Sequence, residues 1–338
     1  METSVCRRKP LIVLTGPTAS GKTGLSLALA KRIGAEIISA DSMQVYRGMD
    51  IGSAKLLPEE RQGIPHYLID ELDPTEDFDV ARFSELSRAA IETICGHGRI
   101  PLMVGGTGFY IQAVTREIDF SEAGPDTELR GRLEQTAREQ GPHALHEMLA
   151  AVDPVSAEQI HENNIKRVIR ALEFYYQSGT PISSHNEEQR AKDSPFQLVC
   201  FVLTLSRGEL YRRIDERVDA MMADGLVEEV TRLREKGCRR GMSSMQGLGY
   251  KEILDYLEGE IPLEEAVRRI KRDTRHFAKR QLTWFRREPD VIWIDRDQFG
   301  GDEEKILKAM LDILAEKGIV PAENSHPDGM SLYTEACK

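Results

Sequence analysis

A glycine-rich segment close to the N-terminus restricts the possible folds of this chain more than any other feature. Residues 16–23 read GPTASGKT and fit the pattern G-x-x-x-x-G-K-[ST]. A short apolar run, Pro10 to Thr15, precedes them, and Leu25 to Arg32 continues with helical spacing. A strand that leads through such a loop into a helix gathers backbone N–H groups at the positive end of that helix. The segment therefore predicts a binding site for a di- or triphosphate.

Two residues of this loop have separate expected roles. Lys22 is expected to reach the terminal phosphate, and the Thr23 hydroxyl is expected to hold Mg²⁺. The predicted phosphate-binding residues are Gly16, Pro17, Thr18, Ala19, Ser20, Gly21, Lys22 and Thr23. The motif does not say which reaction follows, and a glycine-rich turn without a ligand is the alternative.

Composition restricts the class of protein. The chain has 338 residues, enough for two lobes, and a net charge of −11. No apolar run approaches the roughly 20 residues of a membrane span. The five cysteines are scattered without a C-x-x-C pair. We therefore expect a reduced, cytoplasmic protein that does not enter a membrane, and we expect a monomer.

One segment has a charge opposite to that of the whole chain. Residues 268–287 hold nine Lys or Arg and a single acid, Asp273. Phe277, Trp284 and Phe285 are interleaved with these charges, as is typical of nucleic-acid surfaces. A solvated helix face is the other interpretation of the same pattern.

Strands alternate with helices along most of the chain, and this order predicts a parallel sheet with helices on both faces. The predicted strands are Pro10–Thr15, Glu36–Ala40, His66–Ile69, Pro101–Val104, Phe196–Leu203 and Val291–Ile294. Helical periodicity alone runs from Asp126 to about Ser178, and a polar stretch follows it. We therefore predict an α/β core formed by residues 10–119 and 196–318, interrupted by a helical insertion domain at 120–195. Residues 319–338 are polar and are expected to be a disordered tail.

Polar residues follow the predicted strands at the ends where ligands gather on parallel sheets. Asp41 comes directly after the second strand and is suited to hold Mg²⁺ or to act as a general base; a helix cap is the alternative. Ser42 and Gln44 beside it offer donors and acceptors for a base edge. Thr107 lies in a second glycine-rich turn, residues 105–108, which we expect to approach the same phosphates.

A pair of arginines is a further candidate for phosphate binding. Arg213 and Arg217 are four residues apart, so they share a helix face and can close over a pyrophosphate. Pairing with neighbouring acids such as Glu209 or Asp215 is the alternative for Arg213.

Seven segments together resemble the tRNA dimethylallyltransferase family. They are GPTASGKT (16–23), DSMQVYRGMDIGSAK (41–55), GGTGFY (105–110), KRVIRALE (166–173), RVDAMMADGLVEEV (217–230), QGLGYKE (246–252) and KRQLTWFR (279–286). The resemblance extends over about residues 10–315. Departures are mild: Asn163-Asn164-Ile165 replaces the Asn-Asp or Asn-Pro step that is common in the family, and QGLGYKE replaces QAIGYKE.

The resemblance implies a P-loop NTPase-like core and a prenyl transfer reaction. A dimethylallyl group would pass from its diphosphate to the N6 amine of the adenine just 3′ of the anticodon of a tRNA. Asp41 would be the general base, and Lys22, Thr23 with Mg²⁺, Thr107 and Arg217 would stabilise the departing diphosphate. The residues expected to contact tRNA are Asp41, Ser42, Met43, Gln44, Thr107, Lys166, Arg167, Val168, Ile169, Arg170 and Arg280.

Three other functions remain open from the residues alone. A small-molecule or nucleotide kinase shares the sheet, the loop and the paired arginines but has no need for the insertion or the basic helix. A non-catalytic RNA-binding module controlled by nucleotide would bind RNA without modifying it. Prenyl transfer to free AMP would retain the chemistry but has no use for the KRVIRALE segment.

Overall fold

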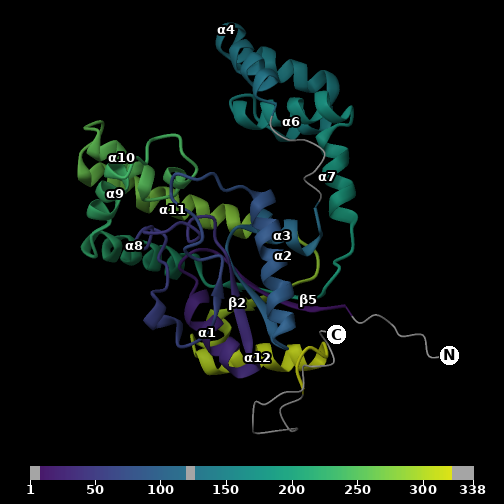
Figure 1. Cartoon of the computed structure of the whole chain (residues 1–338), viewed down its shortest axis with the longest axis vertical. Helices are drawn as coiled ribbons and strands as arrows, with labels where there is room; N and C mark the ends of the chain where they lie inside the picture. The colour runs from purple at the N-terminus through teal and green to yellow at the C-terminus, as the bar shows by residue number, and fades with distance from the viewer. Residues whose placement is uncertain (1–7, 119–125, 322–338) are drawn as a thin grey trace, which may run out of the picture. The chain divides into compact units, whose positions relative to one another are not determined.

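The computed structural model describes residues 8–118 and 126–321 (Figure 1). A parallel six-stranded sheet forms its centre, with the strand order β3-β2-β4-β1-β5-β6. The strands are β1 (Pro10–Thr15), β2 (Ala35–Ala40), β3 (His66–Tyr67), β4 (Ile100–Gly105), β5 (Gln197–Thr204) and β6 (Val291–Asp295). The predicted α/β class is confirmed, and each predicted strand is present; the third ends two residues earlier than expected.

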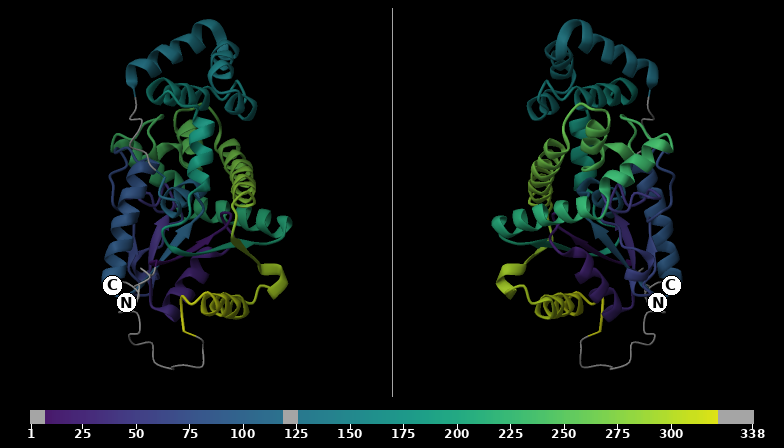
Figure 2. Two further views of the ribbon diagram at one scale, coloured as in Figure 1. Left: turned by 90° about the vertical axis from the view of Figure 1, so that its right-hand side faces the viewer. Right: turned by 90° about the vertical axis from the view of Figure 1, so that its left-hand side faces the viewer.

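Helices cover both faces of the sheet because successive side chains of a strand point to opposite faces. In β1, Ile12 and Leu14 pack against α1 (Lys22–Ile33) and α12 (Glu303–Glu316), which lie together at one face (Figures 1 and 2). Leu11 and Val13 belong to the core on the other face. On that face α2 (Val80–Gly96) contacts β2 and β4, and α3 (Gly108–Thr115) packs on α2. The same apolar core continues into α9 (Leu226–Glu235), α10 (Tyr250–Leu257) and α11 (Leu263–Phe285).

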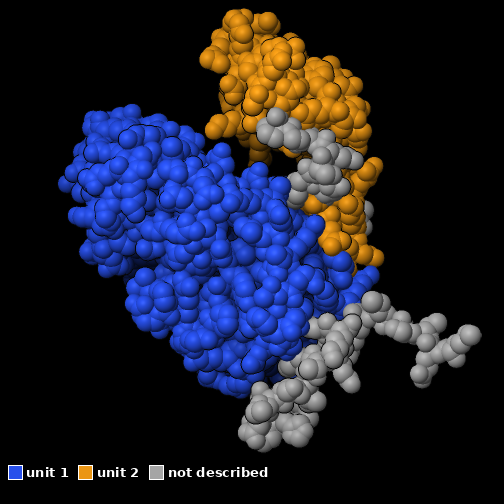
Figure 3. Space-filling model, in the orientation of Figure 1, with its two compact units in different colours: residues 1–115, 195–338 blue, residues 116–194 orange. Residues whose placement is uncertain are grey.

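The chain divides into two compact units, residues 1–115 with 195–338 and residues 116–194 (Figure 3). The second unit contains only helices among its described residues: α4 (Thr127–Val152), α5 (Pro154–Gln159), α6 (Ile165–Ser178) and α7 (Ile182–Ala191). They share an apolar core that includes Leu133, Leu145 and Leu172. Helix α4 is kinked at Gly141, whose φ is +88° and which Pro142 follows.

Two segments differ from the sequence-based expectation. The polar stretch after Pro181 forms the helix α7, which the sequence did not indicate. Its first turn is held by Asp153, whose carboxylate accepts hydrogen bonds from Ser183 N at 3.0 Å and Ser183 Oγ at 2.6 Å. The predicted tail begins too early, because Ile319 is buried against the core around α12. The rest of that tail, from residue 322, lies outside the described residues.

In the part of the chain that the structure describes, no helix is both long enough and apolar enough to span a membrane.

Candidate active site

The phosphate loop folds as the glycine pattern requires. Gly16 has a φ of +142°, and a Cβ at this position would lie 2.5 Å from the carbonyl oxygen of Leu203 in β5. Gly21 has a φ of +88° and directly precedes α1, so the loop delivers its backbone to the N-terminus of that helix. The loop is therefore built for an anion.

Lys22 points back into the loop. Its ammonium donates to the carbonyl oxygens of Gly16 at 2.9 Å and Pro17 at 2.7 Å. Burial lowers the pKa of Lys22 to about 7, with a further lowering by Arg217 and an opposing effect of Asp41. A bound anion would reverse this effect, because negative charge favours the protonated amine.

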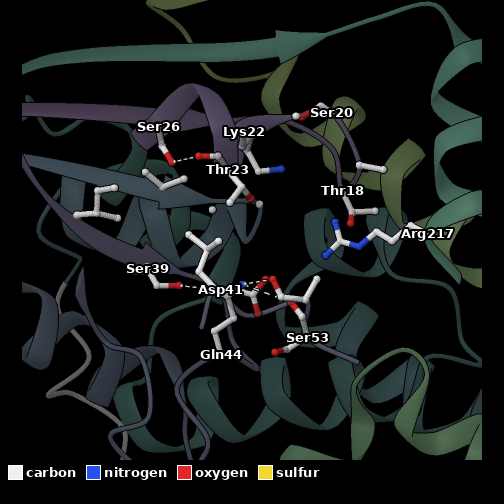
Figure 4. A pocket seen from close by; sticks show the side chains of 18 of the residues that line it. Thr18, Ser20, Lys22, Thr23, Ser26, Ser39, Asp41, Gln44, Ser53 and Arg217 are labelled. Carbon is white, nitrogen blue, oxygen red and sulfur yellow. Dashed lines mark hydrogen bonds between the residues drawn. The ribbon is translucent and has the colours of Figure 1, made fainter. Parts of the chain in front are cut away.

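A cavity of about 360 Å³ opens beside the loop. It joins the predicted phosphate site to the ends of β2 and β4, and Figure 4 shows Lys22, Thr23, Asp41 and Arg217 around it. Of the predicted site residues, those that line it are Thr18, Ala19, Ser20, Gly21, Lys22, Thr23, Asp41, Gln44 and Arg217. The structure thus brings the phosphate loop, the carboxylate and the arginine to one site.

Asp41 and Gln44 are fixed by the chain around them. Asp41 Oδ1 accepts a hydrogen bond from Met43 N at 2.8 Å, and Oδ2 has no hydrogen-bond partner among the described residues. Gln44 Oε1 accepts from Ser39 Oγ at 2.9 Å, while Gln44 Nε2 donates to the Ser53 carbonyl at 3.3 Å. One oxygen of Asp41 is therefore available in the cavity.

The two arginines of α8 (Arg207–Ala223) differ in their surroundings. Arg213 also lines the cavity, but its Nε donates to Glu209 at 2.6 Å. Arg217 makes no hydrogen bond or ion pair with any residue that the structure describes, and its guanidinium is directed into the cavity (Figure 4). Burial lowers the pKa of Arg217, and Asp41 opposes the shift. A charged group without a partner in a concave site indicates an anionic ligand.

Thr107 lies in the second glycine turn, beside the cavity lining. Gly105 and Gly106 line the cavity, whereas Thr107 does not. Thr107 N lies 3.4 Å from the Ala40 carbonyl, and its own carbonyl accepts from Tyr110 N as α3 begins. The turn lines the cavity through its glycines, and the predicted contacts of Thr107 with the diphosphate and with tRNA stay predictions. Gly16, Pro17, Ser42 and Met43 are likewise absent from the cavity lining.

Sequence reasoning missed Gln281 as a site residue. It lies on α11, lines the cavity and contacts both glycine-rich turns. The only signal for Gln281 in the sequence was its place inside the KRQLTWFR segment. The basic and aromatic residues of that segment predicted RNA binding, and the glutamine was not considered.

The segment that follows Asp41 is anchored by Glu229, another residue not singled out from the sequence. Its buried carboxylate accepts from the backbone N–H groups of Asp50, Ile51 and Gly52 at 2.8–3.1 Å. It also accepts from the Tyr250 hydroxyl at 2.8 Å. Four donors on one carboxylate fix this segment against α9 and α10.

Five predicted RNA contacts lie on α6, and the side chains of two of them are buried. Val168 and Ile169 are 0% and 4% exposed in the apolar core of the second unit, so their side chains cannot reach RNA. Arg170 Nη1 donates to the buried Glu173 at 3.1 Å, which gives it a structural task. Lys166 and Arg167 are exposed.

The basic segment of α11 is partly neutralised by neighbouring acids. Its paired residues are Arg268 and Arg269 with Glu265, Arg272 with Asp273, Arg275 with Asp215 and Lys271 with Asp219. Lys279 and Arg280, nearer the end of the helix, are exposed, and Arg280 stacks over Phe277 at 5.7 Å. The positive surface of this helix is thus narrower than the sequence suggested.

The parallel sheet and its phosphate loop define a P-loop α/β protein with a site for a di- or triphosphate. A family model described as IPP transferase matches residues 44–288, and one described as isopentenyl transferase matches residues 10–75. The chain is 57% identical over 312 residues to the tRNA dimethylallyltransferase of Lachnoclostridium phytofermentans, covering 92% of this chain and 99% of that protein. The chain belongs to the tRNA dimethylallyltransferase family, a family of prenyltransferases, as its sequence segments predicted.

Solved structures agree with this assignment. The tRNA isopentenylpyrophosphate transferase of Bacillus halodurans is 44% identical with a TM-score of 0.69, covering 92% of this chain and 99% of that chain. A eukaryotic dimethylallyltransferase whose structures show it acting on tRNA is 30% identical with a TM-score of 0.78, covering 94% and 81%.

Proposed function

We propose that the protein transfers a dimethylallyl group from dimethylallyl diphosphate to N6 of the adenine 3′ of the anticodon in tRNA, with release of diphosphate. The observation that carries this proposal is a single cavity lined by both the phosphate loop and the Asp41 carboxylate. The names of its relatives support tRNA and a prenyl diphosphate as the substrates.

We propose Asp41 as the general base. The adenine N6 attacks C1 of the dimethylallyl group, and the C1–O bond breaks with its electron pair leaving on the diphosphate. N6 must lose one proton as the new C–N bond forms, because the nitrogen would otherwise carry a positive charge. A base that accepts this proton also assists the attack, since the adenine amine is a poor nucleophile. Oδ2 of Asp41 can accept that proton, since Oδ1 is already bonded to Met43 N.

Positive groups on the other side of the cavity favour departure of the diphosphate. Arg217 offers a planar fork that matches two phosphate oxygens, and the loop adds backbone N–H groups at the start of α1. Lys22 uses two of its three N–H donors on the Gly16 and Pro17 carbonyls, which leaves one donor for the diphosphate. These donors act where negative charge grows in the transition state.

The residues present also fit a magnesium ion. No group of three His, Cys, Asp or Glu suited to a metal occurs among the described residues, but the Thr23 hydroxyl and the Asp41 carboxylate both line the cavity. Mg²⁺ is commonly held by one or two protein oxygens together with substrate phosphates and water. We propose that Thr23 holds it, and that the bound ion supplies charge neutralisation on the diphosphate.

We propose that exposed cations bind the tRNA backbone, in addition to the predicted contacts of Asp41 and Gln44 in the cavity. Lys166 and Arg167 on the helical unit and Arg280 on α11 are suited to phosphate contacts. An adenine stacked in an anticodon loop must be extruded before its N6 can enter the cavity.

We further propose a monomeric protein in the cytoplasm. Cys95, Cys200 and Cys238 are free thiols, in keeping with a reducing compartment. Gel filtration with light scattering would test the oligomeric state.

One assay tests the reaction. The protein is incubated with dimethylallyl diphosphate, Mg²⁺ and an anticodon stem-loop that carries the target adenine. We expect the RNA to gain the mass of one dimethylallyl group less a hydrogen. An unchanged RNA, with transfer of the terminal phosphoryl group of ATP to a small acceptor, would identify a kinase instead.

A further inference from the structure

The inward face of α11 contacts the donor site through three residues at helical spacing. Phe277, Gln281 and Trp284 are four and three positions apart, so they share one face of the helix. Phe277 and Gln281 line the cavity. Trp284 covers the second glycine turn, where a Cβ on Gly108 would lie 2.3 Å from its ring.

Gln281 joins the two glycine-rich turns to each other. Its Oε1 accepts from Thr18 N in the phosphate loop at 3.0 Å, and its Nε2 donates to the Gly106 carbonyl at 2.8 Å. The side chain is only 5% exposed. Thr18 and Gly106 are separated from it by 263 and 175 positions in the chain, so the contacts belong to the folded site and not to local structure.

Few side chains can make this connection. The bridge needs one acceptor and one donor on the same planar group, and a primary amide supplies both. A Cβ at position 106 would lie 2.1 Å from Nε2 of Gln281, so a glycine is needed there to admit the amide.

We propose that Gln281 is a positioning residue for the prenyl diphosphate. It holds the first half of the phosphate loop at a fixed separation from the second glycine turn, so that the loop N–H groups converge on the donor. Its effect passes through the loop and not through contact with the reacting atoms. This inference deepens the donor site and rests on the proposed prenyl transfer.

The test compares Gln281→Met and Gln281→Glu with a matched control. Gln112 on α3 is 6% exposed, and its amide donates to Glu288, but it does not line the cavity. Gln112→Met therefore loses a buried amide without altering the donor site. Thermal unfolding measures the structural cost of each variant.

We expect Gln281→Met to raise KM for dimethylallyl diphosphate by about ten-fold, because the Thr18 N–H and the Gly106 carbonyl both lose their partner. The KM for the stem-loop should remain within about two-fold of the unaltered protein. Gln281→Glu should raise the donor KM at least as far, since its second oxygen faces the Gly106 carbonyl and adds negative charge to an anion site. Gln281→Glu also serves as the test if Gln281→Met does not fold.

A second measurement requires no RNA and no turnover. Inorganic diphosphate with Mg²⁺ should raise the melting temperature of the unaltered protein and of Gln112→Met, and should raise it less in both Gln281 variants. This result separates the role of Gln281 from the identity of the acceptor, because it holds even if no RNA is modified. A donor KM or a diphosphate-induced shift unchanged in the Gln281 variants, or changed equally in Gln112→Met, would overturn the proposal.

Discussion

The low pKa of Lys22 makes donor binding depend on pH. This pKa is about 7, because burial disfavours the charged ammonium. Only the protonated amine attracts diphosphate, so binding must shift the pKa upward and take up a proton. The protonated fraction falls from about one half at pH 7 to about one in eleven at pH 8. We therefore expect KM for dimethylallyl diphosphate to rise about five-fold over that interval and about ten-fold per pH unit above it, or ~1.4 kcal/mol per unit.

Titration calorimetry can measure the proton directly. Binding of dimethylallyl diphosphate at about pH 7 should take up about half a proton at Lys22, seen as a dependence of the heat on the ionisation enthalpy of the buffer. Lys22→Met is the matched control, because the ionisation of the ligand itself is retained while the amine is absent. Donor binding with the same pH dependence in the unaltered protein and in Lys22→Met would refute the reasoning.

Four further outcomes follow from the geometry. Asp41→Asn should lower kcat by about 10²- to 10⁴-fold with little change in KM for either substrate, since it removes the basic carboxylate and retains the shape of the side chain. Near-normal turnover in a rapid-quench assay would show that Asp41 only stabilises its turn. Arg217→Lys should raise KM for the prenyl diphosphate and lower kcat, because the charge remains but the bidentate contact is lost. Steady-state kinetics at a saturating stem-loop concentration would measure both effects. Unchanged donor kinetics in Arg217→Ala would show that this arginine does not bind the donor. Replacing Lys166 and Arg167 by Ala should weaken stem-loop binding and reduce the slope of log affinity against log salt concentration by about two units, one per phosphate contact. Filter binding at several salt concentrations measures both quantities. An unchanged slope would show that these two residues do not contact RNA phosphates. Glu229→Ala should lower the free energy of unfolding by about 3 kcal/mol or more, because the backbone N–H groups that Glu229 accepts from lose their acceptor. Urea titration measures this free energy. A loss below about 1 kcal/mol would mean that water replaces the carboxylate.

The parts of the fold that sequence predicted are those set by local patterns. The strand before Gly16 and the helix Lys22–Ile33 follow from a continuous apolar run, a glycine at the left-handed position and helical spacing. Asp41 and Arg217 could be placed near the loop because parallel strands end at the same edge and because the family segments contain them.

The missed features depend on contacts between distant parts of the chain. Gln281 and Glu229 act on backbone groups more than 170 positions away, and neither contact leaves a periodic signal in the sequence. From the KRVIRALE segment, five consecutive residues were predicted to contact RNA. An amphipathic helix, however, buries one of its faces. Val168 and Ile169 lie on that buried face.

The strand order has a consequence for how the polypeptide assembles as it is made. β1 is flanked by β4 on one side and by β5 on the other, and β5 begins only at Gln197, after the whole helical unit. Until that point in translation, one edge of the central strand has no partner, and its backbone is open to pairing with other chains. The helical unit is continuous in sequence and has its own apolar core, so it can fold before β5 is synthesised and pairs with β1. The helical unit can therefore complete its own core before the sheet that lines the cavity can close.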